Sequence, residues 1–174
     1  MAEIKSTLDL VMEKTRNLRF SSEEKREIQM EEARRAFNGL LQKYLDGQLE
    51  LEAVQRGAAG LEQKHELSDR GVLRKVVVEK LAPESMSGPL LILLEQVFGC
   101  DTTALRALGK DYRNEMATRA DDRRRELAAY LEERYEVAGT AVAPNLEADA
   151  KWLDEATTLH GLYAVKLQEE KARL

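Results

Sequence analysis

Few residues of this 174-residue chain carry the chemistry needed to bind a metal ion. Residues 62–65, EQKH, place a carboxylate and an imidazole three positions apart, the spacing found on one helix of a ferritin-like di-metal site. That site needs a second Glu-x-x-His pair and two more glutamates, but the other histidine, His160, has Thr157 three positions before it. Glu62, His65 and His160 are therefore the candidate ligands of an alternative function, a ferritin-like metal-binding helical-bundle enzyme.

Simpler roles also fit these histidines and the single cysteine. His65 lies between a lysine and a glutamate, so we expect an exposed ring. His160 lies on or beside an apolar stripe, which favours a partly buried imidazole hydrogen-bonded to a neighbour. Cys100 is either a buried structural thiol or, close to a helix N-terminus, a somewhat acidified one. Trp152 is either a packing anchor or an interface hot spot.

Other catalytic patterns are missing from the sequence. It contains no phosphate-binding loop, no Gly-x-Ser-x-Gly, no Cys-x-x-Cys and no His-Glu-x-x-His. We therefore predict no catalytic residue and no cofactor, in a protein that is not an enzyme. The net charge of −5 argues against nucleic acid as a partner, because phosphate binding needs a basic surface. The triple-basic run at 123–125 is flanked by acidic residues and is typical of a solvated helix face.

The location of the protein is indicated by its N-terminus, its most apolar stretch and its cysteine content. The opening residues alternate charged and apolar side chains and lack the apolar core of a signal peptide. Residues 90–98 are about half as long as the roughly 20 residues of a membrane-spanning helix. A single cysteine forms no internal disulfide, which fits a reducing compartment. We expect a cytoplasmic protein without a transmembrane segment.

Helical periodicity runs through the N-terminal part of the chain. Residues 4–18 are predicted to form an amphipathic helix with one narrow apolar stripe. Ser21 and Glu24 form a capping box that starts a second helix over about 22–45. The Asp-Gly pair at 46–47 is expected to weaken or bend that helix.

A third helix is predicted over residues 61–81. The small residues at 57–60, GAAG, mark either a break before it or a close helix contact. A connection at 82–88 follows, rich in proline, serine and glycine. The inner face of the third helix is expected to carry Leu73, Val76, Val77 and Leu81.

The most apolar helix is predicted to begin at Pro89 and end at Gly99. Between residues 90 and 98 it is apolar around nearly its whole circumference. It should therefore be the most enclosed element, either in the core of the chain or at a subunit interface.

Asp101 can cap a long helix over about 102–138. Its apolar residues recur every eleven positions, a period of about 3.67 per turn that suits a nearly straight helix. Arg123 falls on the same stripe, where its stem can lie along apolar surface. The row comprises Leu105, Leu108, Tyr112, Met116, Ala120, Leu127, Leu131, Ala138 and Val142.

Pro144 is expected to stop the long helix, and Asn145 to cap the last one. The predicted inner stripe of the last helix is Leu146, Ala150, Leu153, Ala156, His160, Tyr163 and Leu167.

These elements indicate an all-α fold without a sheet, an elongated helical bundle or an antiparallel hairpin of long helices. We expect one helical domain over 1–174, with a subdivision at most into 1–82 and 87–174. Long helices with narrow stripes need partners, which favours a non-enzymatic assembly or adaptor protein that forms a homodimer or another homo-oligomer. The residues expected at the core or interface are Leu91, Leu94, Phe98, Tyr112, Met116, Leu127 and Leu131.

The opening MAEIKSTLDLVMEKT and the charged helical stretch after it resemble the start of small, uncharacterised bacterial helical proteins over about the first 45 residues. This resemblance involves no catalytic motif. A looser resemblance is to the stalk-type helical subunits of rotary ATPases, which also open with amphipathic helices rich in Glu and Lys. Those subunits continue into a mixed α/β domain, whereas no strand is predicted in this chain.

Overall fold

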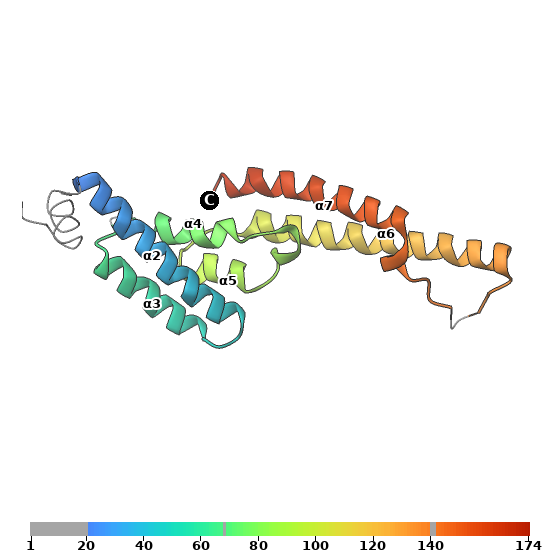
Figure 1. The fold of residues 1–174 in the computed structure, drawn as a ribbon, viewed down its shortest axis with the longest axis horizontal. Coiled ribbons are helices and arrows are strands. Elements are labelled where there is room, and N and C mark those ends of the chain that lie inside the picture. The colour runs from blue at the N-terminus through green and yellow to red at the C-terminus, as the bar shows by residue number, and fades with distance from the viewer. Residues whose placement is uncertain (1–20, 68, 140–141) are drawn as a thin grey trace, which may run out of the picture. The chain divides into compact units, whose positions relative to one another are not determined.

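The structure, a computed structural model, describes residues 21–67, 69–139 and 142–174 (Figure 1). This part of the chain contains six α-helices, two short 3-10 helices and no strand, so the predicted all-α fold is confirmed. None of the described helices is long and apolar enough to cross a membrane. The helix predicted over 4–18 lies outside the described residues.

The chain divides into two compact units, residues 1–73 and 74–174. The boundary lies inside α4, Gly71–Glu79, whereas the subdivision considered from the sequence lies at 82–87.

The described part of the first unit is a hairpin of α2, Ser22–Leu45, and α3, Leu51–Lys64 (Figure 1). The capping box is present: the Ser21 hydroxyl accepts a hydrogen bond from the Glu24 amide at 3.1 Å, and the Glu24 carboxylate accepts one from the Ser21 amide at 2.7 Å. Gly47, with φ +71°, completes the turn between the helices, where a side chain would be strained. The second helix therefore ends at this turn and does not continue beyond it.

The small residues at 57–60 lie within α3 and form a close helix contact, not a break. A Cβ atom at Gly57 would lie 2.6 Å from Cδ1 of Leu40 on α2. Leu40 packs against the glycine backbone, which allows the two helices to approach.

The prediction of a single helix over 61–81 is wrong. Its residues belong to two helices, because α3 ends at Lys64 and α4 begins at Gly71. Glu66 adopts the left-handed conformation, φ +48°, and so ends the helical path without a glycine or proline. The Asp69 carboxylate then accepts a hydrogen bond from the Gly71 amide at 2.8 Å where α4 starts. The expected inner residues, Leu73, Val76, Val77 and Leu81, are all buried.

The second unit contains the most apolar helix of the protein, α5, Pro89–Gln96. It begins at the predicted proline, and Gly99 follows its end with φ +67°. Four of its leucines are buried, while Ile92 is 37% exposed. The helix is thus enclosed, as predicted, except on the side that carries Ile92.

The longest helix is α6, Thr103–Tyr135, and it packs antiparallel to α7, Ala150–Lys171 (Figure 1). The Asp101 carboxylate accepts a hydrogen bond from the Thr103 amide at 2.9 Å, as a cap at this end requires. The 3-10 helix η1, Pro83–Ser85, packs against both α6 and α7. The hairpin of long helices anticipated from the sequence is therefore present in this unit.

Two expectations about the connection after α6 are wrong. The helix does not continue to Pro144 but ends at Tyr135, because Glu136 turns left-handed with φ +54°. Asn145 caps the 3-10 helix η2, Leu146–Ala148, and not the last α-helix. The cap of α7 is Asp149, whose carboxylate accepts a hydrogen bond from the Lys151 amide at 3.0 Å.

Arg123 holds the start of α7 against α6. Its Nε and Nη2 donate to the two carboxylate oxygens of Asp149, the latter at 3.2 Å, and both side chains are mostly buried, at 16% and 12% exposure. Arg123 also contacts Glu126, which in turn accepts from Lys151 at 3.0 Å. The hydrogen bonds with Asp149 raise the pKa of Arg123 and lower that of Asp149. Arg123, although it lies on an apolar stripe, therefore joins α6 to the start of α7 through two hydrogen bonds to one carboxylate.

We expect Asp149→Asn to lower Tm and Asp149→Ala to lower it further. Asparagine keeps a side-chain oxygen for the helix cap but loses the charge that pairs with Arg123, whereas alanine loses both. Thermal denaturation followed by circular dichroism measures the order. In the Arg123→Met background, Asp149→Asn should lower Tm by less, because the arginine that pairs with Asp149 is already absent. An equal decrease in Tm in both backgrounds would contradict the ion pair between Arg123 and Asp149.

Glu95, at the end of α5, is held by two residues at the start of α6. Arg106 donates to its carboxylate twice, at 2.9 and 2.7 Å, and Thr102 donates through its hydroxyl. The hydrogen bonds from Arg106, followed by that from Thr102, lower the pKa of Glu95 to about 2. This ionised cluster joins the ends of two consecutive helices.

The stability contributed by Glu95 should depend on pH in a defined direction. Because its folded-state pKa lies below the unfolded value of 4.5, the contribution is present above that value and is lost as pH falls toward 2. The difference in Tm between the native protein and Glu95→Gln should thus be largest near neutral pH and shrink between about pH 5 and pH 2. A series of melts over this range measures it, and a difference that is constant with pH would contradict the assignment.

Candidate functional site

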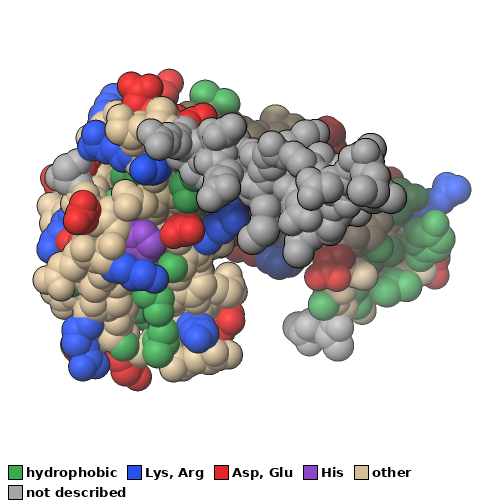
Figure 2. Space-filling model, turned by 60° about the vertical axis from the view of Figure 1, so that its left-hand side comes forward, with side chains coloured by type: hydrophobic (Ala, Val, Ile, Leu, Met, Phe, Trp, Pro, Cys, Tyr) green, Lys and Arg blue, Asp and Glu red, His purple; other side chains and the backbone are tan. Residues whose placement is uncertain are grey.

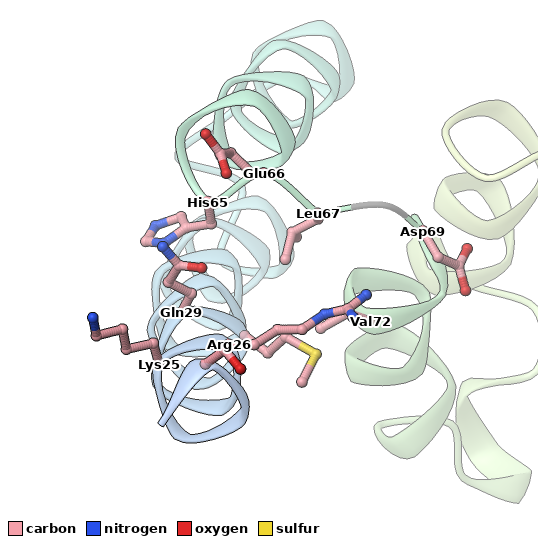
Figure 3. Close-up of a pocket in the computed structure, with 10 residues that line it drawn as sticks. Lys25, Arg26, Gln29, His65, Glu66, Leu67, Asp69 and Val72 are labelled. Carbon is pink, nitrogen blue, oxygen red and sulfur yellow. The ribbon is translucent and has the colours of Figure 1, made fainter. Parts of the chain in front are cut away.

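The first unit contains a cavity of about 560 Å³ beside the N-terminal half of α2 (Figure 3). The connection between α3 and α4 forms its other side. The lining residues are Ser22, Lys25, Arg26, Gln29, Met30, His65, Glu66, Leu67, Asp69 and Val72.

His65 is the most buried polar side chain of this cavity. Its ring is only 6% exposed, so the expectation of an exposed histidine is wrong. Nδ1 lies 3.9 Å from a carboxylate oxygen of Glu32, which is too long for a hydrogen bond. His65 directly follows α3 and continues the helix's inner line of Val54, Ala58 and Leu61, a spacing of four, three and four positions. That spacing is readable in the sequence once α3 is known to begin at Leu51.

The chemistry of this cavity is mixed. Figure 3 shows the carboxylates of Glu66 and Asp69 directed away from the His65 ring, and Asp69 is occupied with the Gly71 amide. Arg26 lies toward Val72 on the opposite side of the view. The cavity therefore offers donors and apolar surface, but among the described residues no carboxylate lies within hydrogen-bonding distance of the imidazole for acid–base work.

The three candidate metal ligands do not form a metal site among the described residues. Glu62 accepts a hydrogen bond from Arg70 at 3.1 Å, while His65 contacts Glu32 as above. In the described ranges, no three His, Cys, Asp or Glu side chains are placed to share a metal ion. Glu62 and His65 have the sequence spacing of metal ligands, but they do not form a metal site with other described residues.

His160 belongs to the second unit and is 47% exposed. Its Nε2 lies 3.3 Å from a carboxylate oxygen of Glu84, and its ring meets the Tyr112 ring edge-on with centroids 6.3 Å apart. The predicted polar neighbour is therefore found. His160 nevertheless lies on the flank of α7, because Leu159 occupies the inner position.

A tyrosine cluster fills the middle of the α6–α7 hairpin. Tyr112 and Tyr163 pack with ring centroids 5.3 Å apart beside Leu159. The Tyr163 hydroxyl donates to Glu115 at 2.9 Å, and burial is the main cause that raises the pKa of Tyr163. Arg119 is the main cause that lowers the pKa of Glu115. The packed rings and the hydrogen-bonded hydroxyl of Tyr163 together position α7 on α6.

The residues expected at the core or interface separate into two groups. Leu91 and Leu94 are fully buried and Tyr112 is nearly so, which makes them core residues. Partial burial is found at Phe98, Met116, Leu127 and Leu131. Leu127 and Leu131 line a shallow hollow of about 320 Å³ with η2. Cys100 and Trp152 are likewise neither buried nor fully exposed.

The apolar surface that sequence reasoning missed lies on the outer side of α7. Leu153 and Leu162 are each 49% exposed and Val165 is 63% exposed. Leu162 and Val165 lie within the stretch 156–165, which contains no Asp, Glu, Lys or Arg in a chain of which 34% is charged, and Leu153 lies three positions before it. The predicted stripe placed Leu153 inside, which is wrong: the buried residues of α7 are Leu159, Tyr163 and Leu167.

Figure 2 shows a different kind of surface, where Lys and Arg side chains alternate with Asp and Glu. Hydrophobic side chains lie among them on this face, and no continuous basic area is visible on its described part. Mixed charge of this kind is ordinary protein surface.

Comparisons with known proteins provide no further guide to the site. No protein-family model, curated protein or solved structure matches the chain. Its function therefore has to be inferred from its own residues.

Proposed function

We propose that this protein is a non-enzymatic helical assembly protein of the cytoplasm, which forms a homodimer through the faces of its long helices. The observation that supports this most directly is the exposure of three apolar side chains on α7, Leu153, Leu162 and Val165. The cytoplasmic location is supported by the single cysteine.

The exposed apolar side chains of α7 differ from scattered surface leucines, which need no explanation. The inner side of the helix is already satisfied by Leu159, Tyr163 and Leu167 against the rest of its unit. Burial accounts for the leucines of α5 and for Leu159 and Tyr163 of α7, but not for Leu162 and Val165. Neighbouring apolar side chains that the fold leaves exposed, such as Leu162 and Val165, are typical of a surface that binds another protein.

The solution mass tests this proposal. We expect light scattering on a size-exclusion column to give twice the chain mass of 19.7 kDa at two protein concentrations. A mass of one chain at both concentrations would contradict the proposed assembly function.

Metal analysis tests the alternative. We expect protein purified without chelator to carry no stoichiometric iron, manganese or zinc. Stoichiometric metal that is lost in His65→Ala, with Glu32→Ala as a matched control on the neighbouring carboxylate, would instead favour a metal-binding enzyme.

A further inference from the structure

We infer that the cavity of the first unit binds a small organic carboxylate that carries an apolar chain. This site is independent of the proposed assembly function, whose support comes from exposed residues of α7. Three features of the cavity point to such a ligand: a buried imidazole without a hydrogen bond to the described residues, polar donors along one line of α2, and an apolar wall.

The cavity has the size of a ligand pocket. Its volume of about 560 Å³ lies within the range of about 300–1,000 Å³ that is usual for small-molecule sites. The described residues that line it, between Ser22 and Val72, all belong to the first unit (Figure 3). The site is therefore built by one compact part of the chain.

His65 is the buried polar group of this cavity. Its side chain is only 6% exposed, and the Glu32 carboxylate, 3.9 Å from Nδ1, is too distant for a hydrogen bond. No side-chain nitrogen in the described ranges is both sealed from solvent and unpaired, so the ring nitrogens of His65 remain accessible through the cavity. Buried polar groups normally have a hydrogen-bond partner, and a ligand with an acceptor oxygen supplies one.

Three polar side chains of α2 line the same cavity. Ser22, Lys25 and Gln29 are three and four positions apart, which places them on one face of the helix. None of the three side chains has a hydrogen bond or ion pair with another described residue. Figure 3 shows the Gln29 side chain extending toward the His65 ring. The α2 side of the cavity therefore presents donors to a ligand near the imidazole.

The other charged side chains of the cavity are Arg26, Glu66 and Asp69. The Asp69 carboxylate already accepts a hydrogen bond from the Gly71 amide at 2.8 Å. Figure 3 shows Glu66 directed away from the imidazole and Arg26 lying toward Val72. The two acidic groups of the lining are thus occupied or turned away, while the donors of α2 and the imidazole are not. A carboxylate is the acceptor that ammonium, amide and imidazole donors all bind well.

The apolar wall selects a ligand with a hydrocarbon chain. It consists of Met30, Leu67 and Val72, which are all partly buried. Figure 3 shows Leu67 and Val72 on the side of the view opposite the His65 ring. A ligand with its carboxylate at His65 can therefore lay its chain along this wall and remove apolar surface from water.

The first test uses octanoate as the probe and the full-length protein in isothermal titration calorimetry. We expect octanoate to bind, and acetate and octan-1-ol to bind about tenfold more weakly or worse, because each lacks one half of the recognition. Octan-1-ol that binds as tightly as octanoate would overturn the assignment of a carboxylate site. Absence of octanoate binding would overturn the inference and leave the assembly function standing.

The second test locates the site by substitution. Lys25→Glu should weaken octanoate binding about tenfold or more, because it places a carboxylate among the donors. Lys43→Glu makes the same change of charge on an exposed residue of α2 outside the cavity, and should leave affinity unchanged. Circular dichroism confirms that both variants remain helical. Equal affinities for the two variants would overturn the site.

Substitutions at the imidazole and at Glu32 test the position of the ligand's carboxylate. His65→Leu should abolish binding, because it removes the buried donor but keeps an apolar side chain. Glu32→Gln should tighten binding, because it removes a negative charge beside the ring. Since Glu32 is mostly exposed, this variant tests the site even if His65→Leu fails to fold. Weaker octanoate binding in Glu32→Gln would contradict a carboxylate bound at His65.

Discussion

Leu94→Ala lowers the free energy of unfolding by about 2–5 kcal/mol, the range for removing a leucine from a packed interior. Leu94 is fully buried and lies in α5 beside Leu90, Leu91 and Leu93, which are also buried. Truncation removes apolar contact and leaves a cavity at a site that is closed to solvent, which the close-packed surroundings fill only in part. Urea denaturation followed by circular dichroism measures the loss.

Ile92→Ala is the matched control, two positions away on the same helix. Ile92 is 37% exposed, so truncation there should cost about 1 kcal/mol or less. Equal losses for the two variants would mean that α5 is not enclosed in the way the structure shows. An unchanged midpoint for Leu94→Ala would contradict the core assignment outright.

Gly109→Ala destabilises the protein by about 1–3 kcal/mol, although alanine is the better helix former. Gly109 lies in α6 where the 3-10 helix η1 crosses it. A Cβ atom at this position would lie 2.6 Å from both the Cβ and the carbonyl oxygen of Met86. Because a backbone atom is involved, the clash cannot be relieved by rotating a side chain. The close approach of η1 to α6 thus requires a glycine.

Ala107→Gly separates this contact effect from helix propensity. Ala107 is exposed on the same helix, so the change should cost about 0.5–1 kcal/mol through propensity alone. If propensity governed position 109 as well, Gly109→Ala would raise stability by a similar amount. A rise in the unfolding midpoint of Gly109→Ala would therefore refute the close contact with Met86.

The prediction for Gly109 concerns how the second unit holds α7 in place. Gly109 sets the distance between η1 and α6, and η1 also packs against α7. At the other end of α7, Lys171 donates to the carbonyl oxygen of Leu81 at 2.7 Å, and Arg123 links its start to α6. The exposed apolar side chains of α7 that we propose for self-association therefore lie on a helix fixed at both ends.

Several features of this protein are determined by the sequence itself. The capping box at Ser21 and Glu24, the bounds of α2 and the start of α5 at Pro89 all depend on residues within one helical turn. The burial of α5 follows from its composition, since a helix that is apolar on nearly all sides must be enclosed. The all-α class follows from repeated helical periodicity without alternating strands.

The tertiary structure alone decided which face of α7 is buried. Its apolar residues are distributed around the helix, so a stripe through Leu153 and His160 and another through Leu159 satisfy the same spacing. Packing against Tyr112 of α6 selects the second stripe and leaves Leu153 on the surface. The predicted stripe was correct at Tyr163 and Leu167 but wrong at Leu153 and His160, which are exposed, and it missed Leu159, which is buried.

The break after Lys64 and the role of Arg123 were decided in the same way. Glu66 enters a left-handed conformation that its residue type does not favour, and this moves His65 from an expected surface position into the end of a helix hairpin. Arg123 pairs with Asp149, 26 residues away, where the sequence suggested a solvated run and an arginine stem along apolar surface but no ion-pair partner. Local interactions within a turn are encoded by neighbouring residues and can be predicted from them, whereas helix register and ion pairing depend on which distant surfaces pack together.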